Sequence, residues 1–140
     1  VFDQKSNDYR IRNKEFPYKN LTLLEIAKER GFDDGIIITD DGQIAETSMA
    51  TLLLRIAGKW VTPPLSSGIL NGVVRALVLE AGLANVRRID VIEIEKIEAG
   101  LLLTSLRNAQ PIGEIEGRIL DIDDEKYAEI HQLMNSYKGL

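Results

Sequence analysis

The segment VTPPLSSGILNGVVRALVLEAG (residues 61–82) has the residue types of an anion-binding site at the start of a helix. The predicted helix covers residues 73–81, follows Gly72, and opens with Val-Val-Arg, so its first turn carries no acidic residue. A helix N-terminus presents free N–H groups and a partial positive charge, and a preceding glycine lets a ligand approach the backbone. The segment is therefore compatible with a phosphate cradle. The alternative is an ordinary loop-to-helix junction capped by Asn71, which the local pattern alone favours because no P-loop motif is present.

Other site chemistries have weak support in the sequence. His131 is the single histidine, so a Ser-His-Asp triad would have to use it, and it lies on the last predicted helix, where we expect a surface position. Because the chain has one histidine and no cysteine, only carboxylates are left as metal ligands. We interpret Glu93, Glu95 and Glu98 as a solvated face, and we expect no metal site.

Three further stretches accompany TPPLSSGILNGVVR (62–75) in chain order: NKEFPYKN (13–20), GFDDGIIITDDGQIAETS (31–48) and LLTSLRNAQPI (102–112). Together the four resemble the C-terminal half of the fold-type IV pyridoxal-phosphate enzymes, the class IV aminotransferase family. That family includes branched-chain and D-amino acid aminotransferases and 4-amino-4-deoxychorismate lyase. Each motif is weak by itself, but four in the same order and spacing, between about Arg10 and Arg118, are fairly specific. The resemblance implies pyridoxal 5'-phosphate as the cofactor.

The resemblance also implies the residues around the cofactor ring. Lys14, followed at the family's spacing by Tyr18 and Asn20, would be the catalytic lysine. It would hold the cofactor covalently and later move the α-proton of the substrate, which requires a lysine able to lose its charge near neutral pH. Tyr18 would hydrogen-bond the ring oxygen. Glu46, in a G-x-[IV]-x-E pattern, would keep the pyridine nitrogen protonated, so that the ring acts as an electron sink. Without the resemblance, Lys14 and Glu46 would be interpreted as exposed residues.

The phosphate site is implied in the same way. The backbone N–H groups of Val73 and Val74 would donate to the phosphate, and Ser105 matches a second phosphate-binding position, with Thr104 as a weaker candidate. Many relatives have threonine where this chain has Val74, so one hydroxyl donor is missing here. Arg75 recurs in the motif, and we interpret it as a structural residue that could pair with a carboxylate.

These residues have to be positioned by a mixed α/β fold with many hairpins. We expect helices at residues 21–30, 73–81, 95–99 and 127–137, and strands at 35–39, 43–47, 52–56, 60–61, 101–104, 111–115 and 118–122. The order lacks the regular strand–helix alternation of a doubly wound sheet. The resemblance implies a mixed, hairpin-rich sheet or pseudo-barrel with packed helices, as in the larger C-terminal domain of D-amino acid aminotransferase-like enzymes.

Length and composition limit the class of protein further. The chain has 140 residues, which suits one cofactor-binding domain over 1–140, and its net charge of -5 argues against a nucleic-acid surface. No apolar run approaches the roughly 18 residues of a membrane span, and no signal peptide is visible, so we expect a cytoplasmic protein. The family's smaller N-terminal domain is absent, so we expect one half of a longer polypeptide or a truncated relative. The resemblance implies a homodimer.

The activity has three candidate interpretations. Asn71-Gly72 and the missing threonine at Val74 resemble the lyases, so the first is 4-amino-4-deoxychorismate lyase, which releases pyruvate and forms 4-aminobenzoate. The second is a branched-chain or D-amino acid aminotransferase, which would use every residue named above. The third, of another class, is a non-catalytic remnant of the fold that serves as a binding or dimerisation module. The sequence favours the first only slightly.

Overall fold

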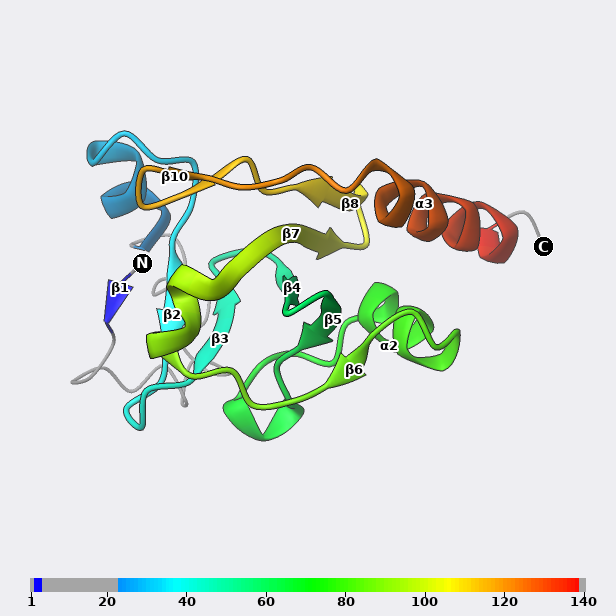
Figure 1. Cartoon of the computed structure of the whole chain (residues 1–140), viewed down its shortest axis with the longest axis horizontal. Coiled ribbons are helices and arrows are strands. Elements are labelled where there is room, and N and C mark those ends of the chain that lie inside the picture. Colours follow the sequence, from blue (N-terminus) through cyan, green and yellow to red (C-terminus); the bar gives the residue numbers. More distant parts are fainter. Residues whose placement is uncertain (1, 4–22, 139–140) are drawn as a thin grey trace.

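Two sheets, a short hairpin and flanking helices make up residues 2–3 and 23–138, the part that this computed structural model describes (Figure 1). The strands are β1 (Phe2–Asp3), β2 (Ile36–Ile38), β3 (Ile44–Thr47), β4 (Thr51–Ile56), β5 (Lys59–Thr62), β6 (Asn85–Val86), β7 (Ile97–Thr104), β8 (Asn108–Pro111), β9 (Glu114–Ile115) and β10 (Arg118–Ile119). The helical elements are residues 23–29, η2 (Leu65–Ser67), α2 (Val73–Glu80), η3 (Val91–Lys96) and α3 (Asp124–Lys138).

The larger sheet has the strand order β6-β5-β4-β7-β8, and the smaller one the order β1-β2-β3. Within the larger sheet β4 pairs antiparallel with both β5 and β7, β7 pairs antiparallel with β8, and β6 adds to β5 in parallel. In the smaller sheet β2 pairs antiparallel with β3 and parallel with β1. The expected mixed α/β class with a hairpin-rich sheet and packed helices is confirmed.

Strand β4 separates two hydrophobic cores. Successive side chains of a strand point to opposite faces, and the sequence Leu52-Leu53-Leu54 supplies an apolar residue to each face in turn. Leu52 and Leu54 pack with residues of β2 and β3, whereas Leu53 packs with Val74 and Val78 of α2 and with residues of α3. All three leucines are fully buried. The larger sheet thus holds β3 on one side and α2 on the other.

The C-terminal segment is fastened to the larger sheet by a group of ion pairs. The guanidinium of Arg55, on β4, donates to Glu98 at 3.0 Å, to Asp121 at 2.9 Å and to Asp123 at 3.2 Å. Partial burial opposes the charge of Arg55, but the hydrogen bonds that it donates to the carboxylates of Glu98 and Asp123 raise its pKa. These contacts hold the chain that leads into α3 against the edge of β4 and β7.

Two expected elements are wrong. A helix was expected at 95–99, but the helical turns end at Lys96 and β7 runs without a break through Gly100. This glycine has a packing role, because a Cβ on it would lie 2.7 Å from Ile112 Cδ1. A single strand was expected at 111–115, but the chain forms β8 and β9 on either side of Gly113.

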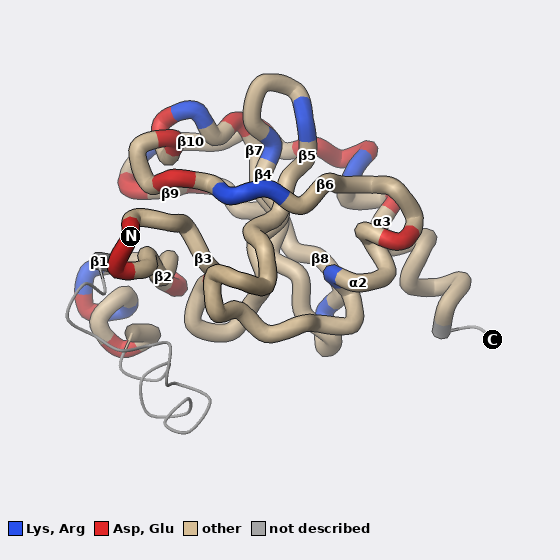
Figure 2. The backbone as a smooth tube through the Cα atoms, turned by 90° about the horizontal axis from the view of Figure 1, so that it is seen from below, with Lys and Arg blue, Asp and Glu red and all other residues tan. Residues whose placement is uncertain are grey.

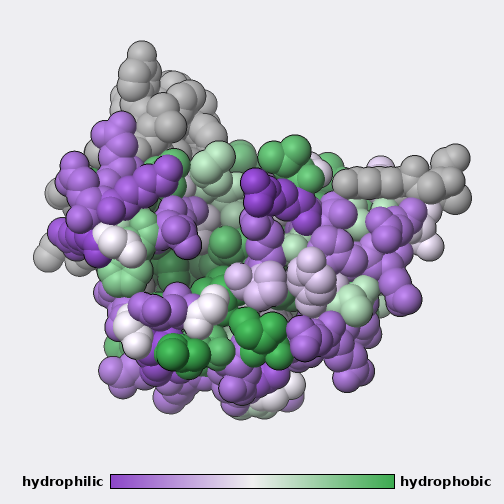
Figure 3. Space-filling model, turned by 90° about the horizontal axis from the view of Figure 1, so that it is seen from above, coloured by the Kyte–Doolittle hydropathy of each residue, from purple (hydrophilic) through white to green (hydrophobic). Residues whose placement is uncertain are grey.

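Charged residues are unevenly distributed over the molecule. Figure 2 shows charged residues of both signs around the β9–β10 hairpin, whereas most of the backbone near β3 is uncharged. In Figure 3 hydrophobic residues gather toward the middle of the face seen from above, with hydrophilic residues around them. Among the helices described, none combines the length and the apolar character needed to cross a membrane.

Candidate functional site

A cavity of about 440 Å³ lies where three segments of the chain meet. Its walls are the end of β3 with the turn into β4 (residues 46–51), the end of the loop into α2 with the first helical turn (70–75), and the end of β7 with the residue that follows it (103–105). Four of the residues predicted from the sequence, Glu46, Val73, Val74 and Ser105, line this one cavity. The fold therefore brings together residues that lie up to 59 positions apart in the sequence (from 46 to 105).

Glu46 is the acidic residue in the wall of this cavity, and it is 5% exposed. It lies near the end of β3, opposite Ile37 of β2, next to an irregularity in the register of the two strands. Among the described residues that line the cavity, only Glu46 and Arg75 carry a charge. A buried carboxylate in a wall where it is the single acidic group among the described residues is suited to hold a proton on a basic nitrogen.

The turn that follows Glu46 is held by side-chain hydrogen bonds. Thr47 Oγ1 accepts a bond from the Ala50 N–H at 2.9 Å, which closes the turn. Asp34 Oδ1 accepts from both the hydroxyl and the N–H of Ser48, the latter at 3.3 Å. Asp34 is half-buried, and these bonds fix the position of the turn. Its acidic character alone gave no signal of this contact.

The N-terminus of α2 opens into the cavity without a side-chain cap. The N-cap residue is Gly72, with φ -71° and ψ 150°, and among the described residues no side chain caps the first N–H groups. The alternative of a junction capped by Asn71 is therefore wrong. The first turn carries no acidic residue, as the sequence indicated. Val73 is 53% exposed, whereas Val74 is 2% exposed and packs in the core beside Leu103.

Ser105 lines the third wall of the cavity. It follows β7 directly and is exposed. Its neighbour Thr104 uses its hydroxyl inside the turn, where Thr104 Oγ1 accepts a hydrogen bond from the Arg107 N–H at 3.0 Å. Both Thr104 and Ser105 line the cavity, and the choice of Ser105 as the phosphate ligand stays a prediction.

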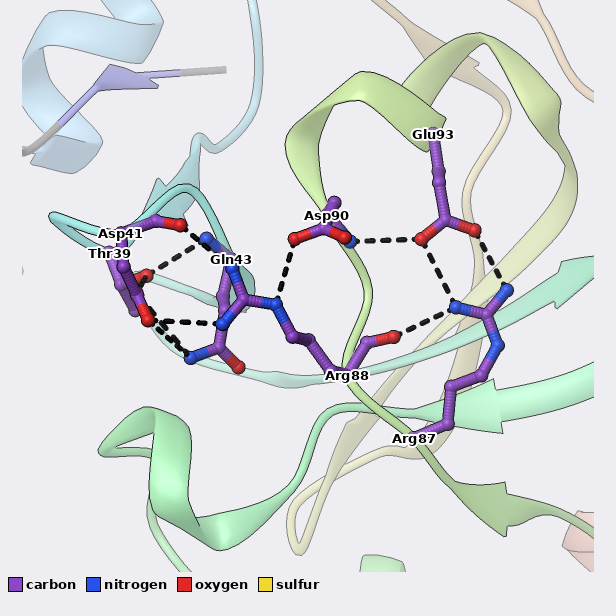
Figure 4. Close-up of polar contacts among 7 residues, drawn as sticks. All are labelled: Thr39, Asp41, Gln43, Arg87, Arg88, Asp90 and Glu93. Carbon is purple, nitrogen blue, oxygen red and sulfur yellow. Dashed lines mark hydrogen bonds and ion pairs between the residues drawn. The ribbon is translucent and has the colours of Figure 1, made fainter.

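Other candidate residues make structural contacts. His131 Nε2 lies 3.0 Å from the carbonyl oxygen of Ala109, and its ring stacks at a tilt on Tyr127, so it helps to pack α3 on β8. Glu93 is not part of a solvated face: it accepts from Arg87 at 2.8 Å, which lowers the pKa of Glu93 (Figure 4). In the described ranges no group of three or more His, Cys, Asp or Glu residues could hold a metal ion.

A second cavity, of about 320 Å³, contains none of the predicted site residues. It lies between the turn before β2 and the β9–β10 hairpin. The predicted residues Lys14 and Tyr18 lie outside the described residues, so their positions relative to the first cavity stay predictions.

Comparison with known proteins identifies related chains. The family model described as amino-transferase class IV matches residues 4–115. A fold IV-transaminase, CpuTA1, from Curtobacterium pusillum is 28% identical, with a TM-score of 0.75 over 82% of this chain and 41% of the other. A protein assigned as a 4-amino-4-deoxychorismate lyase from Legionella pneumophila is 22% identical, with a TM-score of 0.77 over 85% and 46%.

The branched-chain amino acid aminotransferase of Escherichia coli is similar at 20% identity, with a TM-score of 0.69 over 86% of this chain and 42% of that enzyme. The chain thus spans less than half the length of each of these solved structures. A search of curated proteins found no match.

Proposed function

The chain belongs to the class IV aminotransferase family, and from this premise we propose that it is the cofactor-binding part of a pyridoxal-phosphate enzyme. The family match covers residues 4–115 and confirms the resemblance noted in the sequence. Among similar solved structures, an aminotransferase from Brucella abortus is described as bound to pyridoxal phosphate. The observation that carries the proposal is the cavity lined by Glu46, the first turn of α2 and Ser105.

The residues present fit this cofactor. The cavity has a volume of about 440 Å³, which lies in the range of about 300–1,000 Å³ typical of small-molecule sites. At one wall the uncapped N–H groups of α2 suit a phosphate, and no acidic residue in the first turn opposes it. At another wall the buried carboxylate of Glu46 suits a protonated ring nitrogen. The cavity thus offers a positive partner for the phosphate and a negative partner for the protonated ring nitrogen.

Each residue of the proposed site has one task. The N–H groups of Val73 and Val74 and the hydroxyl of Ser105 bind the phosphate and fix the cofactor's position. The carboxylate of Glu46 keeps the proton on the ring nitrogen. Lys14 would hold the cofactor and accept the α-proton of the substrate, and Tyr18 would orient the ring through its oxygen. When bound, pyridoxal phosphate supplies the electron sink for the carbanion.

Backbone donors carry most of the phosphate site in this chain. Val74 lies in the core at 2% exposure and has no hydroxyl, so the proposal assigns the side-chain donor for the phosphate to Ser105, which lines the same cavity. This departure from the threonine of many relatives, together with Asn71-Gly72, is the feature that favours the lyase. We propose 4-amino-4-deoxychorismate as the substrate, converted to 4-aminobenzoate and pyruvate. The alternative is transfer of the amino group from a branched-chain or D-amino acid to a 2-oxo acid.

The remaining features of the proposal concern the whole protein. We propose that it acts as a homodimer in the cytoplasm and that a smaller domain, outside this chain, completes the substrate pocket. Neither proposal depends on the arrangement of Glu46, α2 and Ser105.

Two measurements on the full-length protein test the proposed function. Addition of pyridoxal phosphate is expected to produce a visible absorption band that borohydride bleaches. The protein is then assayed side by side with 4-amino-4-deoxychorismate, for 4-aminobenzoate, and with branched-chain amino acids and a 2-oxo acid, for the new amino acid. Release of 4-aminobenzoate supports the lyase, and amino transfer alone supports the alternative. A protein that produces no absorption band with the cofactor contradicts both and supports a non-catalytic module.

A further inference from the structure

Arg75 is a buried cation in the first turn of α2. Its side chain is 4% exposed although arginine is almost never fully buried without a partner. Nη2 donates to the carbonyl oxygen of Pro63 at 3.0 Å, and Nε has no hydrogen-bond partner among the described residues. The same residue contributes to the wall of the cavity that contains Glu46 and Ser105.

The charge of Arg75 is not balanced by an ion pair. Within residues 23–138 no carboxylate lies within ion-pair distance of its guanidinium, which differs from the arrangement expected from the sequence. Other arginines of the fold are paired in this way, as Arg55 is with Glu98 and Arg87 with Glu93. Burial lowers the pKa of Arg75, but a guanidinium keeps its proton at neutral pH. The cation therefore remains charged inside the fold.

The position of Arg75 makes its burial more costly. It lies at the N-terminal end of α2, where the helix dipole already contributes a partial positive charge. Two sources of positive potential next to one cavity repel each other and both favour an anion there. A buried charge without a partner is strongly unfavourable unless another group compensates it. An anion bound in the cavity would supply this compensation.

We propose that Arg75 is a positioning residue. Its buried positive charge attracts the phosphate of the cofactor through the electrostatic field in the cavity, without contacting the phosphate. The proposal rests on the proposed function. The hydrogen bond to Pro63 fixes the guanidinium and also ties the first turn of α2 to the end of β5. The apo protein therefore carries an unfavourable charge that phosphate binding relieves.

This role differs from a purely structural one in a measurable way. If Arg75 only anchors the loop at Pro63, its removal lowers the stability of the apo protein and weakens all ligands equally. If its charge serves the phosphate, an uncharged side chain of similar length leaves the apo protein as stable as before or more stable. Affinity is then lost only for ligands that carry the phosphate.

The experiment compares pyridoxal phosphate with pyridoxal, which lacks the phosphate, in the full-length protein. Dissociation constants for both are measured by absorption for the parent, Arg75→Met and Arg75→Lys, together with the melting temperature of each apo protein. Arg118→Met is the matched control, because Arg118 also donates to a backbone carbonyl, Ile94 O at 2.7 Å, and does not line the cavity.

We expect Arg75→Met to weaken pyridoxal phosphate about tenfold or more while changing pyridoxal by less than about threefold. Arg75→Lys keeps the charge and is expected to retain most of the difference in affinity between pyridoxal phosphate and pyridoxal. Arg118→Met is expected to change neither affinity. If Arg75→Met does not fold, Arg75→Gln provides the same comparison.

Two results in a folded Arg75→Met protein overturn the proposal and leave the proposed function intact. One is an equal loss of affinity for both ligands, and the other is an unchanged affinity for pyridoxal phosphate. A parent protein that binds no pyridoxal phosphate contradicts the proposed function, and this inference with it.

Discussion

Asp34 Oδ1 accepts hydrogen bonds from the hydroxyl and the N–H of Ser48, two residues after Glu46. The contact ties the turn before β2 to the turn that shapes one wall of the cavity. Because Ser48 is 1% exposed, loss of the carboxylate leaves two buried donors without this acceptor. The position of Glu46 thus depends on a residue 12 positions earlier in the chain.

Replacing Asp34 with alanine is expected to lower the free energy of unfolding by about 1–3 kcal/mol, the usual effect of removing a charged acceptor from a partly buried site. Urea denaturation of the parent and the variant measures this change. Asp33→Ala is the matched control, because Asp33 is the exposed neighbour. If both variants unfold at the same urea concentration as the parent, Asp34 does not stabilise the turn.

Glu46→Gln tests the proposed role of the buried carboxylate. The amide is almost the same size, so the fold and the cofactor content are expected to persist. A neutral amide cannot hold a ring proton as an anion does, and loss of a charge-assisted hydrogen bond suggests a decrease in turnover of about ten- to a hundredfold. Turnover by the fully loaded variant is compared with that of the parent. Equal turnover at equal cofactor content would contradict this role.

Val73→Asp separates the stability of α2 from its anion site. Val73 is 53% exposed, so the fold tolerates a polar side chain there, and an acidic residue in the first turn stabilises a helix by about 0.3–1 kcal/mol. The same carboxylate would repel the phosphate. We expect unchanged or higher thermal stability together with a loss of affinity for pyridoxal phosphate of about tenfold or more.

Val73→Asn is the control for Val73→Asp, because it has the same shape without the charge. A titration with pyridoxal phosphate compares the two variants. If the aspartate variant binds the cofactor as tightly as the asparagine variant, the phosphate is not at this helix N-terminus.

Asp41 gives the protein a pH-dependent contribution to stability. Hydrogen bonds from Thr39 and Arg88 lower the pKa of Asp41 from 3.8 to about 2 (Figure 4). The unfolded chain therefore takes up this proton at a higher pH than the folded chain does. The stabilisation is present above about pH 4 and is lost as the pH falls toward 2.

Asp41→Asn is expected to reduce the loss of stability between pH 4 and pH 2 and to lower stability at pH 7. The measurement is the free energy of unfolding across this pH range, with Asp33→Asn as the control for an exposed carboxylate. The same pH dependence in the Asp41→Asn variant and the parent would show that Asp41 does not carry this contribution.

The sequence predicted local elements well where their signals were local. Asp41-Gly42 predicted a hairpin, and Gly42 has the positive φ of 83° that such a turn requires. The helix at 73–81 was predicted from its apolar residues and is present as α2 at Val73–Glu80. The exposure of the individual residues of α2 was not predicted. The apolar residues alone did not reveal that Val73 lies at the surface while Val74 is in the core.

Features set by contacts between distant residues could not be predicted in this way. A helix was expected at 95–99, before Gly100, but Gly100 lies inside β7, and its small size leaves room for the side chain of Ile112. The hydrogen bond from Ser48 to Asp34 joins residues 14 positions apart, and neither residue type indicates it. The hydrogen bond from Arg75 to Pro63 O has no sequence signal, since any backbone carbonyl can accept one. The family motifs indicated Glu46, Val73, Val74 and Ser105, which line one cavity, without explaining how the fold holds them.

The most direct test of the account is to locate the lysine that holds the cofactor. The full-length protein is incubated with pyridoxal phosphate, reduced with borohydride, digested and analysed by peptide mapping. The account predicts a pyridoxyl group on Lys14, in the peptide that contains NKEFPYKN. An adduct on Lys19 or Lys28, or no adduct in the full-length protein, would contradict it.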